Sequence, residues 1–241
     1  MKTRHLFLSL KLFILCLLLS GCHEYVRQQV EFTIVNDNTG SFDHQTMDIQ
    51  ANDIVDLFEL NTSPLNYGRA RTRFLSDVSL EHTWHISLPF VSDAEYQRYV
   101  REAHIRQFGQ QIDSILTKLK TASQGKPASN LFTPIVRELQ RLENSQADKK
   151  ILVIYSDLFH NDHEYSVYRR TANLTVFEQE ATQFITQKMN GLGSLQGIEV
   201  YVVYQPTLQT DRKFSIVSRV FSEILEAKGA QVSVGSNFIK T

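Results

Sequence analysis

The chain has 241 residues, 42% of them hydrophobic, which is enough for a sizeable buried core. Its 25 basic and 26 acidic residues leave no excess of positive charge, which excludes binding to nucleic acid through a strongly basic face. The two cysteines, Cys16 and Cys22, both lie near the N-terminus, so the rest of the chain contains no cysteine that could form a disulfide.

The first 21 residues have the pattern of a secretory signal peptide. Lys2 and Arg4 precede an apolar stretch of 15 residues from Leu6 to Ser20, and a membrane-spanning helix would need about 20. We therefore expect residues 1–21 to be removed on export. The remaining chain carries 22 basic and 26 acidic side chains, and this net charge of −4 again gives no electrostatic case for nucleic acid.

The end of this segment, Leu19-Ser20-Gly21-Cys22, resembles the lipobox of bacterial lipoproteins. In that family cleavage falls just before the cysteine, which then carries the lipid. The resemblance implies a membrane anchor at Cys22 and a lipidated tether at residues 22–29, held firmly because each buried CH2 contributes about 0.8 kcal/mol. His23 replaces an aspartate that tends to retain lipoproteins at the inner membrane. The implied location is therefore the bacterial cell envelope, with the outer membrane favoured, on its periplasmic side or its surface.

Residues 30–241 form one predicted domain, which begins with alternating apolar residues that indicate a strand at 30–36 with a buried face. A helix is predicted over 46–60, and the composition of 61–68 predicts a loop. The next predicted elements are strands at 71–79 and 83–88, a long helix from a capped start at Ser92 to about Ala122, and a helix at about 130–143. The two strands lie so close in sequence that they predict a hairpin, with one of them antiparallel at the sheet edge.

The continuous apolar run Ile151 to Tyr155 predicts a strand that is buried on both faces of a parallel sheet. The C-terminal elements are a helix at 174–190, a strand at 198–204, a helix at 213–228 and a short strand at 231–234. This order predicts an α/β fold with a doubly wound, mainly parallel sheet, one antiparallel edge strand and helices on both faces.

Two of the predicted strands end in an aspartate. Asp37 follows the strand at 30–36, and Asp157 follows the strand at 151–155. Ligands of open parallel sheets bind outside the carboxyl ends of the strands, so we expect both aspartates to contribute to one site. Thr39 and Ser41 add two hydroxyl groups in the turn after Asp37.

The segment Asp37-Asn38-Thr39-Gly40-Ser41 resembles the D-x-S-x-S signature of von Willebrand factor type A (vWA) domains, with Thr39 in place of the first serine. Ser129-Asn130-Leu131 is similar to the second loop of that family, with serine for threonine. Ser156-Asp157 after an apolar strand is similar to the third loop, although Leu158 replaces the usual glycine. The gaps of 92 and 28 residues between Asp37, Ser129 and Asp157 also agree, and the resemblance covers residues 28–235.

This resemblance implies a metal-ion-dependent adhesion site for Mg²⁺ or Mn²⁺, which are hard cations that take oxygen ligands. Thr39 and Ser41 would ligate the ion through their hydroxyls, and Ser129 would do so directly or through water. Asp37 and Asp157 would ligate the ion or hold its waters. An acidic side chain of a protein partner would complete the coordination. The implied function is a membrane-anchored binding module without catalytic activity.

Other interpretations remain open. Asp37 and Asp157 could serve a metal-dependent phosphohydrolase, although Thr39 occupies the position of the second aspartate expected in a haloacid dehalogenase. The chain could also be a vWA-like scaffold that holds no metal. A weaker alternative is a zinc site at His160 and His163, for which no third ligand lies at a regular spacing.

Overall fold

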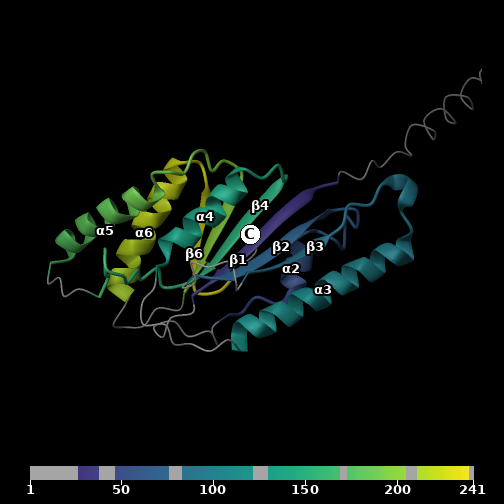
Figure 1. The fold of residues 1–241 in the computed structure, drawn as a ribbon, viewed down its shortest axis with the longest axis horizontal. Coiled ribbons are helices and arrows are strands. Elements are labelled where there is room, and N and C mark those ends of the chain that lie inside the picture. Colours follow the sequence, from purple (N-terminus) through teal and green to yellow (C-terminus); the bar gives the residue numbers. More distant parts are fainter. Residues whose placement is uncertain are drawn as a thin grey trace, which may run out of the picture.

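In the computed structural model, which describes residues 27–37, 47–75, 83–121, 130–168, 173–204 and 211–238, six strands form one sheet in the order β3-β2-β1-β4-β5-β6 (Figure 1). The strands are β1 (Gln29–Asn36), β2 (Tyr67–Phe74), β3 (Thr83–Leu88), β4 (Lys149–Tyr155), β5 (Ile198–Val203) and β6 (Gln231–Gly235). All neighbouring strands are parallel except β2 and β3, which pair antiparallel at the edge. The predicted α/β fold is confirmed.

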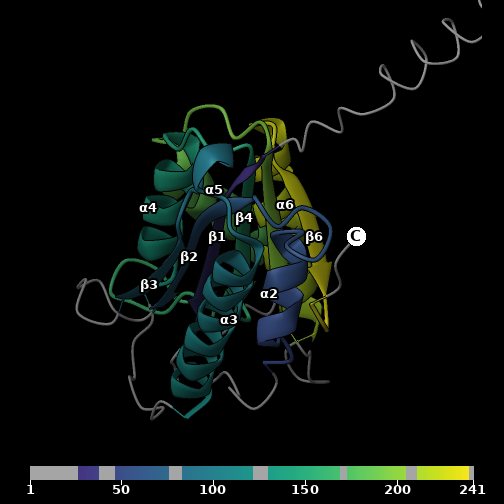
Figure 2. The same ribbon diagram turned by 90° about the vertical axis from the view of Figure 1, so that its right-hand side faces the viewer.

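Helices cover both faces of the sheet (Figures 1 and 2). One face carries α2 (Ala51–Leu57) and α3 (Arg98–Thr121), and the other carries α4 (Phe132–Glu143), α5 (Leu174–Met189) and α6 (Asp211–Ala227). The chain moves from β1 to β2 in one direction and from β4 through β5 to β6 in the other. Because crossovers between parallel strands are right-handed, their helices fall on opposite faces.

Several predicted boundaries were wrong. The predicted helix over 46–60 is shorter, because α2 spans only Ala51–Leu57. The capped start at Ser92 belongs to a separate short 3-10 helix, η2 (Asp93–Glu95), in which Ser92 and Glu95 form the capping box. The long helix α3 begins three residues beyond η2, at Arg98.

Strand β2 begins at Tyr67, inside the segment predicted to be a loop, because Gly68 allows the chain to pass close to β1. Gly68 pairs with Val30 and has φ of 146°, and a Cβ atom at this position would lie 1.9 Å from the carbonyl oxygen of Val30. Any side chain would therefore clash with the β1 backbone. The strand ends at Phe74, so the predicted strand at 71–79 was placed too late.

The predicted buried face of β1, formed by Val30, Phe32 and Ile34, is confirmed. The opposite face is buried as well, although it carries Glu31 and Thr33. Helix α4 covers this face, and its Arg141 donates hydrogen bonds to Glu31 (2.7 Å) and to Thr33 Oγ1 (2.6 Å). A polar strand face is thus buried because a charged helix residue satisfies it.

Around α4, a buried charge network joins the helix to the sheet. Glu138 is 2% exposed, and its carboxylate accepts hydrogen bonds from Arg71 Nε (3.2 Å), Arg73 Nη1 (3.2 Å) and Arg141 Nε (2.9 Å). The pairing satisfies charges that would otherwise be costly to remove from water. Among the described residues, no helix is both long and apolar enough to cross a membrane.

Candidate functional site

The pairing of β1 with β4 brings Asp37 and Asp157 to the same edge of the sheet. Asn36 lies opposite Tyr155 in the register, and the backbone N–H of Asp37 donates to the carbonyl oxygen of Tyr155 at 2.8 Å. Asp37 is 0% exposed and Asp157 is 2% exposed. The structure therefore confirms that these two predicted site residues follow adjacent parallel strands at the carboxyl edge.

A serine joins the two strand ends directly. The hydroxyl of Ser156 donates to Oδ2 of Asp37 at 2.9 Å, and its oxygen accepts from the backbone N–H of Leu158 at 3.0 Å. The N–H of Leu158 uses a lone pair of the hydroxyl oxygen, so the single hydroxyl hydrogen stays available to Asp37. Sequence reasoning did not include Ser156 in the site, although the Ser-Asp pair that resembles the third vWA loop contains it.

The residues after Ser156 form a tight turn that fixes Asp157. Oδ1 of Asp157 accepts from the backbone N–H of Phe159 at 2.8 Å. Leu158 has φ of 57°, a left-handed conformation that favours glycine, and its side chain is 0% exposed. The backbone therefore takes the conformation suited to the glycine of the vWA pattern, although the sequence has leucine there.

The last residue of β4, Tyr155, holds the chain just after residues 38–46, the first candidate loop. The Tyr155 hydroxyl donates to Oδ1 of Asp48 at 2.9 Å and accepts from the backbone N–H of Ile49 at 3.3 Å. Burial, and then the Asp48 carboxylate, raise the pKa of the Tyr155 phenol well above its usual value, so the phenol keeps its proton. Tyr155 and Ser156 thus fasten Asp48 and Asp37, which lie on either side of residues 38–46.

His160 fastens the segment that precedes α4 in the same way. Its Nδ1 accepts from the backbone N–H of Leu131 at 3.3 Å, and its Nε2 lies 2.9 Å from Oδ2 of Asp162. The ring packs against both Phe132 and Phe184, with centroid distances of 5.6 Å and 4.8 Å, and these two phenylalanines also contact each other at 6.0 Å. An imidazole that accepts at Nδ1 is the neutral tautomer protonated at Nε2. Consistent with this, burial lowers the His160 pKa, against the opposing effect of Asp162.

The remaining predicted site residues, Thr39, Ser41 and Ser129, lie outside the described residues, as does the lipid-attachment residue Cys22. The structure does describe residues that border the segments 38–46 and 122–129 in the sequence. Residues 38–46 begin after Asp37 and end before Met47, and residues 122–129 end before Asn130. All these ends lie in sequence next to residues that are hydrogen-bonded to the segment 155–160.

The carboxylates of Asp37 and Asp157 are of the chemical type that a hard cation binds, because carboxylate oxygens are preferred ligands of Mg²⁺ and Mn²⁺. Within the described ranges, no group of three or more His, Cys, Asp or Glu side chains could hold a metal ion. The site implied by the vWA resemblance relies on hydroxyl ligands as well. At His160, Nδ1 accepts from the Leu131 N–H and Nε2 lies 2.9 Å from Oδ2 of Asp162, so both nitrogens that could bind zinc face other groups.

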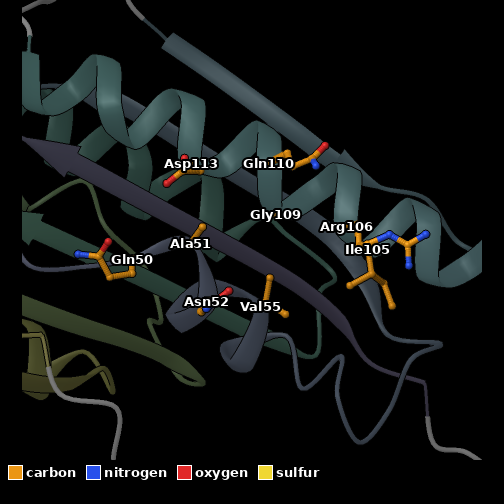
Figure 3. A pocket seen from close by; sticks show the side chains of 9 residues that line it. All are labelled: Gln50, Ala51, Asn52, Val55, Ile105, Arg106, Gly109, Gln110 and Asp113. Carbon is orange, nitrogen blue, oxygen red and sulfur yellow. The ribbon is translucent and has the colours of Figure 1, made fainter.

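A concave feature lies between α2 and α3 (Figure 3). It is an open groove of about 530 Å³. Its lining includes Gln50, Asn52 and Val55 on the α2 side, and Arg106, Gln110 and Asp113 on α3. Neither of the described site residues, Asp37 and Asp157, is among the residues that line it.

The sequence matches no family profile and no curated protein. Solved structures with a similar fold include the D319A mutant of the PilB minor pilin from Streptococcus sanguinis, with a TM-score of 0.51 and 10% identity over 90% of this chain and 59% of the pilin chain. The PilB minor pilin itself gives a TM-score of 0.45, with 12% identity over 88% of this chain and 58% of the other.

The BatB protein from Bacteroides thetaiotaomicron, described as a conserved hypothetical protein, gives a TM-score of 0.34 and 12% identity over 88% of this chain and 91% of its own. The match to the pilin spans about three fifths of the length of the pilin chain. At 10% identity, the similarity to the pilin shows a common doubly wound α/β fold.

Proposed function

We propose that the chain is a lipid-anchored, exported vWA-like module that binds a protein partner through a divalent cation at the carboxyl edge of its sheet. Mg²⁺ or Mn²⁺ would be held by oxygen atoms of Asp37, Thr39, Ser41, Ser129 and Asp157. An acidic side chain of the partner would occupy the open coordination position. The module would bind and would not catalyse a reaction.

The observation that carries the proposal is the junction of Asp37 and Asp157 through Ser156. Two buried carboxylates follow adjacent strands, and Ser156, the residue before Asp157, donates a 2.9 Å hydrogen bond to Asp37, which gives an oxygen-rich edge. Tyr155 and His160 add support, because Tyr155 holds Asp48, just after the first candidate loop, and His160 holds Leu131, just after the second, against the same segment. These contacts favour the convergence of the three loops that the vWA resemblance implies.

The direction of β1 supports the combination of an anchor and a distant site. The strand has 8 residues, with the tether before its first residue, Gln29, and Asp37 after its last. At about 3.3 Å per residue, the strand separates its two ends by about 26 Å. A lipid before β1 would thus leave the carboxyl edge on the side of the domain away from the membrane, where a partner can reach it.

The metal proposal is tested by titrating purified protein with Mg²⁺ and Mn²⁺ while its thermal unfolding is measured. Binding to the folded state raises the melting temperature by mass action. The wild type should show this shift, and Asp37→Asn and Asp157→Asn should lose it. Asparagine keeps one acceptor oxygen, for the Ser156 hydroxyl at position 37 and for the Phe159 N–H at position 157, while it removes the charge and one oxygen ligand, so these variants separate metal affinity from folding.

Asp148→Asn is the matched control, because Asp148 lies at the opposite edge, where it accepts from the N–H of Gln29 at 2.8 Å. It should keep the full metal-dependent shift. An equal shift in Asp37→Asn, or no shift in the wild type, would contradict the metal proposal. Turnover of p-nitrophenyl phosphate that disappears in Asp37→Asn would favour a phosphohydrolase instead.

The anchor is tested separately by Cys22→Ser. The wild type should fractionate with membranes and be released by detergent, whereas Cys22→Ser should be recovered in the soluble fraction. Retention of the variant in the membrane fraction would contradict anchoring through Cys22.

A further inference from the structure

Exposed aromatic side chains gather between β3 and the start of α3. Phe90 is 52% exposed, Tyr96 37% and Tyr99 71%. Of the exposed aromatic residues in the described ranges, only Tyr168 lies elsewhere. We name Phe90, Tyr96 and Tyr99 the aromatic patch. Such a concentration in ten residues of chain is unusual on a surface that faces only water.

The aromatic patch lies beside the N-terminal end of β1. The guanidinium carbon of Arg27 lies 5.4 Å from the centroid of the Phe90 ring, and Arg27 also forms an ion pair with Asp93 of η2. Figure 1 shows the same neighbourhood, with the first residues of β1 and the start of α3 at one end of the molecule. This end is opposite the edge that carries Asp37 and Asp157.

The sequence limits how far this end can lie from the proposed lipid. Arg27 lies five positions after Cys22 in the sequence, and a fully extended chain of that length spans at most about 18 Å. Because the Arg27 guanidinium contacts the Phe90 ring, the distance from the proposed lipid-bearing cysteine to that ring is limited to this span plus the length of the Arg27 side chain and the 5.4 Å contact. Close to a lipid anchor lies the interface between lipid headgroups and acyl chains, where side chains with an apolar ring and a polar tip are favoured.

We propose that the aromatic patch rests in the headgroup interface of the membrane that holds the anchor. This inference depends on the anchoring part of the proposed function. The lipid supplies attachment, and Phe90, Tyr96 and Tyr99 supply a second contact that orients the domain. In that orientation β1 points away from the bilayer and presents the carboxyl edge to a partner.

The charges around the aromatic patch favour a zwitterionic interface over an anionic one. Arg27 pairs with Asp93, and Arg98 pairs with Glu102 at 2.9 Å. Glu95 caps η2 by accepting from the backbone N–H of Ser92 at 3.3 Å, and it also accepts from the Ser92 hydroxyl at 2.7 Å. The basic groups are thus matched by acids, and attraction to anionic lipid contributes little. The contact should therefore be insensitive to salt.

The aromatic patch also has a fixed base. Arg101 of α3 is 1% exposed and donates to the carbonyl oxygens of Pro64 and Pro89, at 2.6 Å and 2.8 Å, and to that of Asn66. One buried guanidinium therefore holds α3 against the residue that precedes Phe90. A rigid base reduces the ordering cost of placing the aromatic rings in the interface.

The test uses the full acylated chain reconstituted into phosphatidylcholine vesicles, with an environment-sensitive fluorophore on a cysteine at Ala94→Cys. Ala94 is exposed within η2, so the change leaves all three aromatic residues in place. Cys16 is removed with the signal peptide and the Cys22 thiol is acylated, so the label is specific. The matched control is Ser236→Cys, at an exposed residue just after β6 at the opposite edge.

The probe at position 94 should emit at shorter wavelength in vesicles than the probe at position 236, and lipids with brominated acyl chains should quench it. The shift should persist at high salt. It should disappear when Phe90→Ser and Tyr99→Ser are added, while the protein still floats with the vesicles. Both residues are exposed, and circular dichroism checks that the variant stays folded.

The outcomes separate the two parts. If the wild type floats with vesicles but the probe at 94 emits like the probe at 236, anchoring stands and the interface contact is overturned. If the acylated wild type does not float, both are overturned. A shift at 94 that lipid does not quench, and that grows with protein concentration, would assign the aromatic patch to a second copy of the chain and overturn the membrane contact.

Discussion

The hydroxyl of Ser156 donates a hydrogen bond of 2.9 Å to Oδ2 of Asp37, joining two buried residues that are 119 positions apart in the sequence. This bond ties the first candidate loop to the third. It belongs to a series in which Tyr155 holds Asp48 and His160 holds the backbone of Leu131. The segment after β4 is therefore the structural centre of the candidate site.

Ser156→Ala removes this bond. The buried Asp37 carboxylate then loses a donor, and the expected loss in the free energy of unfolding is about 1–3 kcal/mol. Urea denaturation measures it. The control is Ser215→Ala, an exposed position on α6, where a change within about 0.5 kcal/mol is expected. Equal stability of Ser156→Ala and the control would contradict a structural role for the bond.

Leu158 sets two effects against each other. Glycine at this position would relieve the left-handed backbone strain, worth about 1–2 kcal/mol, but loss of a buried leucine side chain costs about 2–5 kcal/mol. Leu158→Gly should therefore be less stable than the wild type in thermal unfolding. Leu158→Ala loses nearly the same side-chain volume and keeps the strain, so it should be less stable still. A Leu158→Gly protein more stable than the wild type would show that strain outweighs burial here.

The buried imidazole of His160 should make stability depend on pH. Burial lowers its pKa in the folded state, and Lys188 acts in the same direction, whereas Asp162 and Glu164 oppose the shift. The unfolded chain therefore binds a proton at about pH 6.5, where the folded chain does not. The stabilisation is present above that pH and falls as the pH drops through it. Urea denaturation at a series of pH values from about 7.5 to about 5 measures this change in the free energy of unfolding.

His160→Gln provides the comparison for this pH effect. Its amide oxygen can accept from the Leu131 N–H and does not titrate, so the variant should lose less stability than the wild type across the same pH range. Parallel stability curves for the two proteins would contradict the assignment of the effect to His160.

Glu138 is the common acceptor of three arginines in the network around α4. Glu138→Gln removes its charge and leaves Arg71, Arg73 and Arg141 facing a neutral amide in a largely buried site. Breaking one side of a buried ion pair costs about 3–5 kcal/mol, and that loss is expected in urea denaturation. Glu226→Gln, at an exposed position on α6, should leave stability nearly unchanged. A loss below that range would indicate that solvent screens the arginines.

Much of the fold followed from local patterns. The apolar run at 151–155 predicted β4, and the close spacing of two short strands predicted the antiparallel edge, which the pairing of β2 with β3 confirms. The errors lie where local signals mislead. Ser92 and Glu95 do form a capping box, but the box starts a three-residue turn and not the long helix, because sequence alone does not show where a helix continues.

The sequence by itself determined the strand and helix order, and with it the edge at which Asp37 and Asp157 would lie, because parallel strands place their carboxyl ends together. Only the tertiary structure decided how that edge is held. Ser156, Tyr155 and His160 hold residues 29 to 119 positions away. Likewise Glu31 and Thr33 became buried only because α4 brought Arg141 to them. Periodicity records which face of an element is apolar, whereas hydrogen bonds between distant polar groups exist only once the chain has packed.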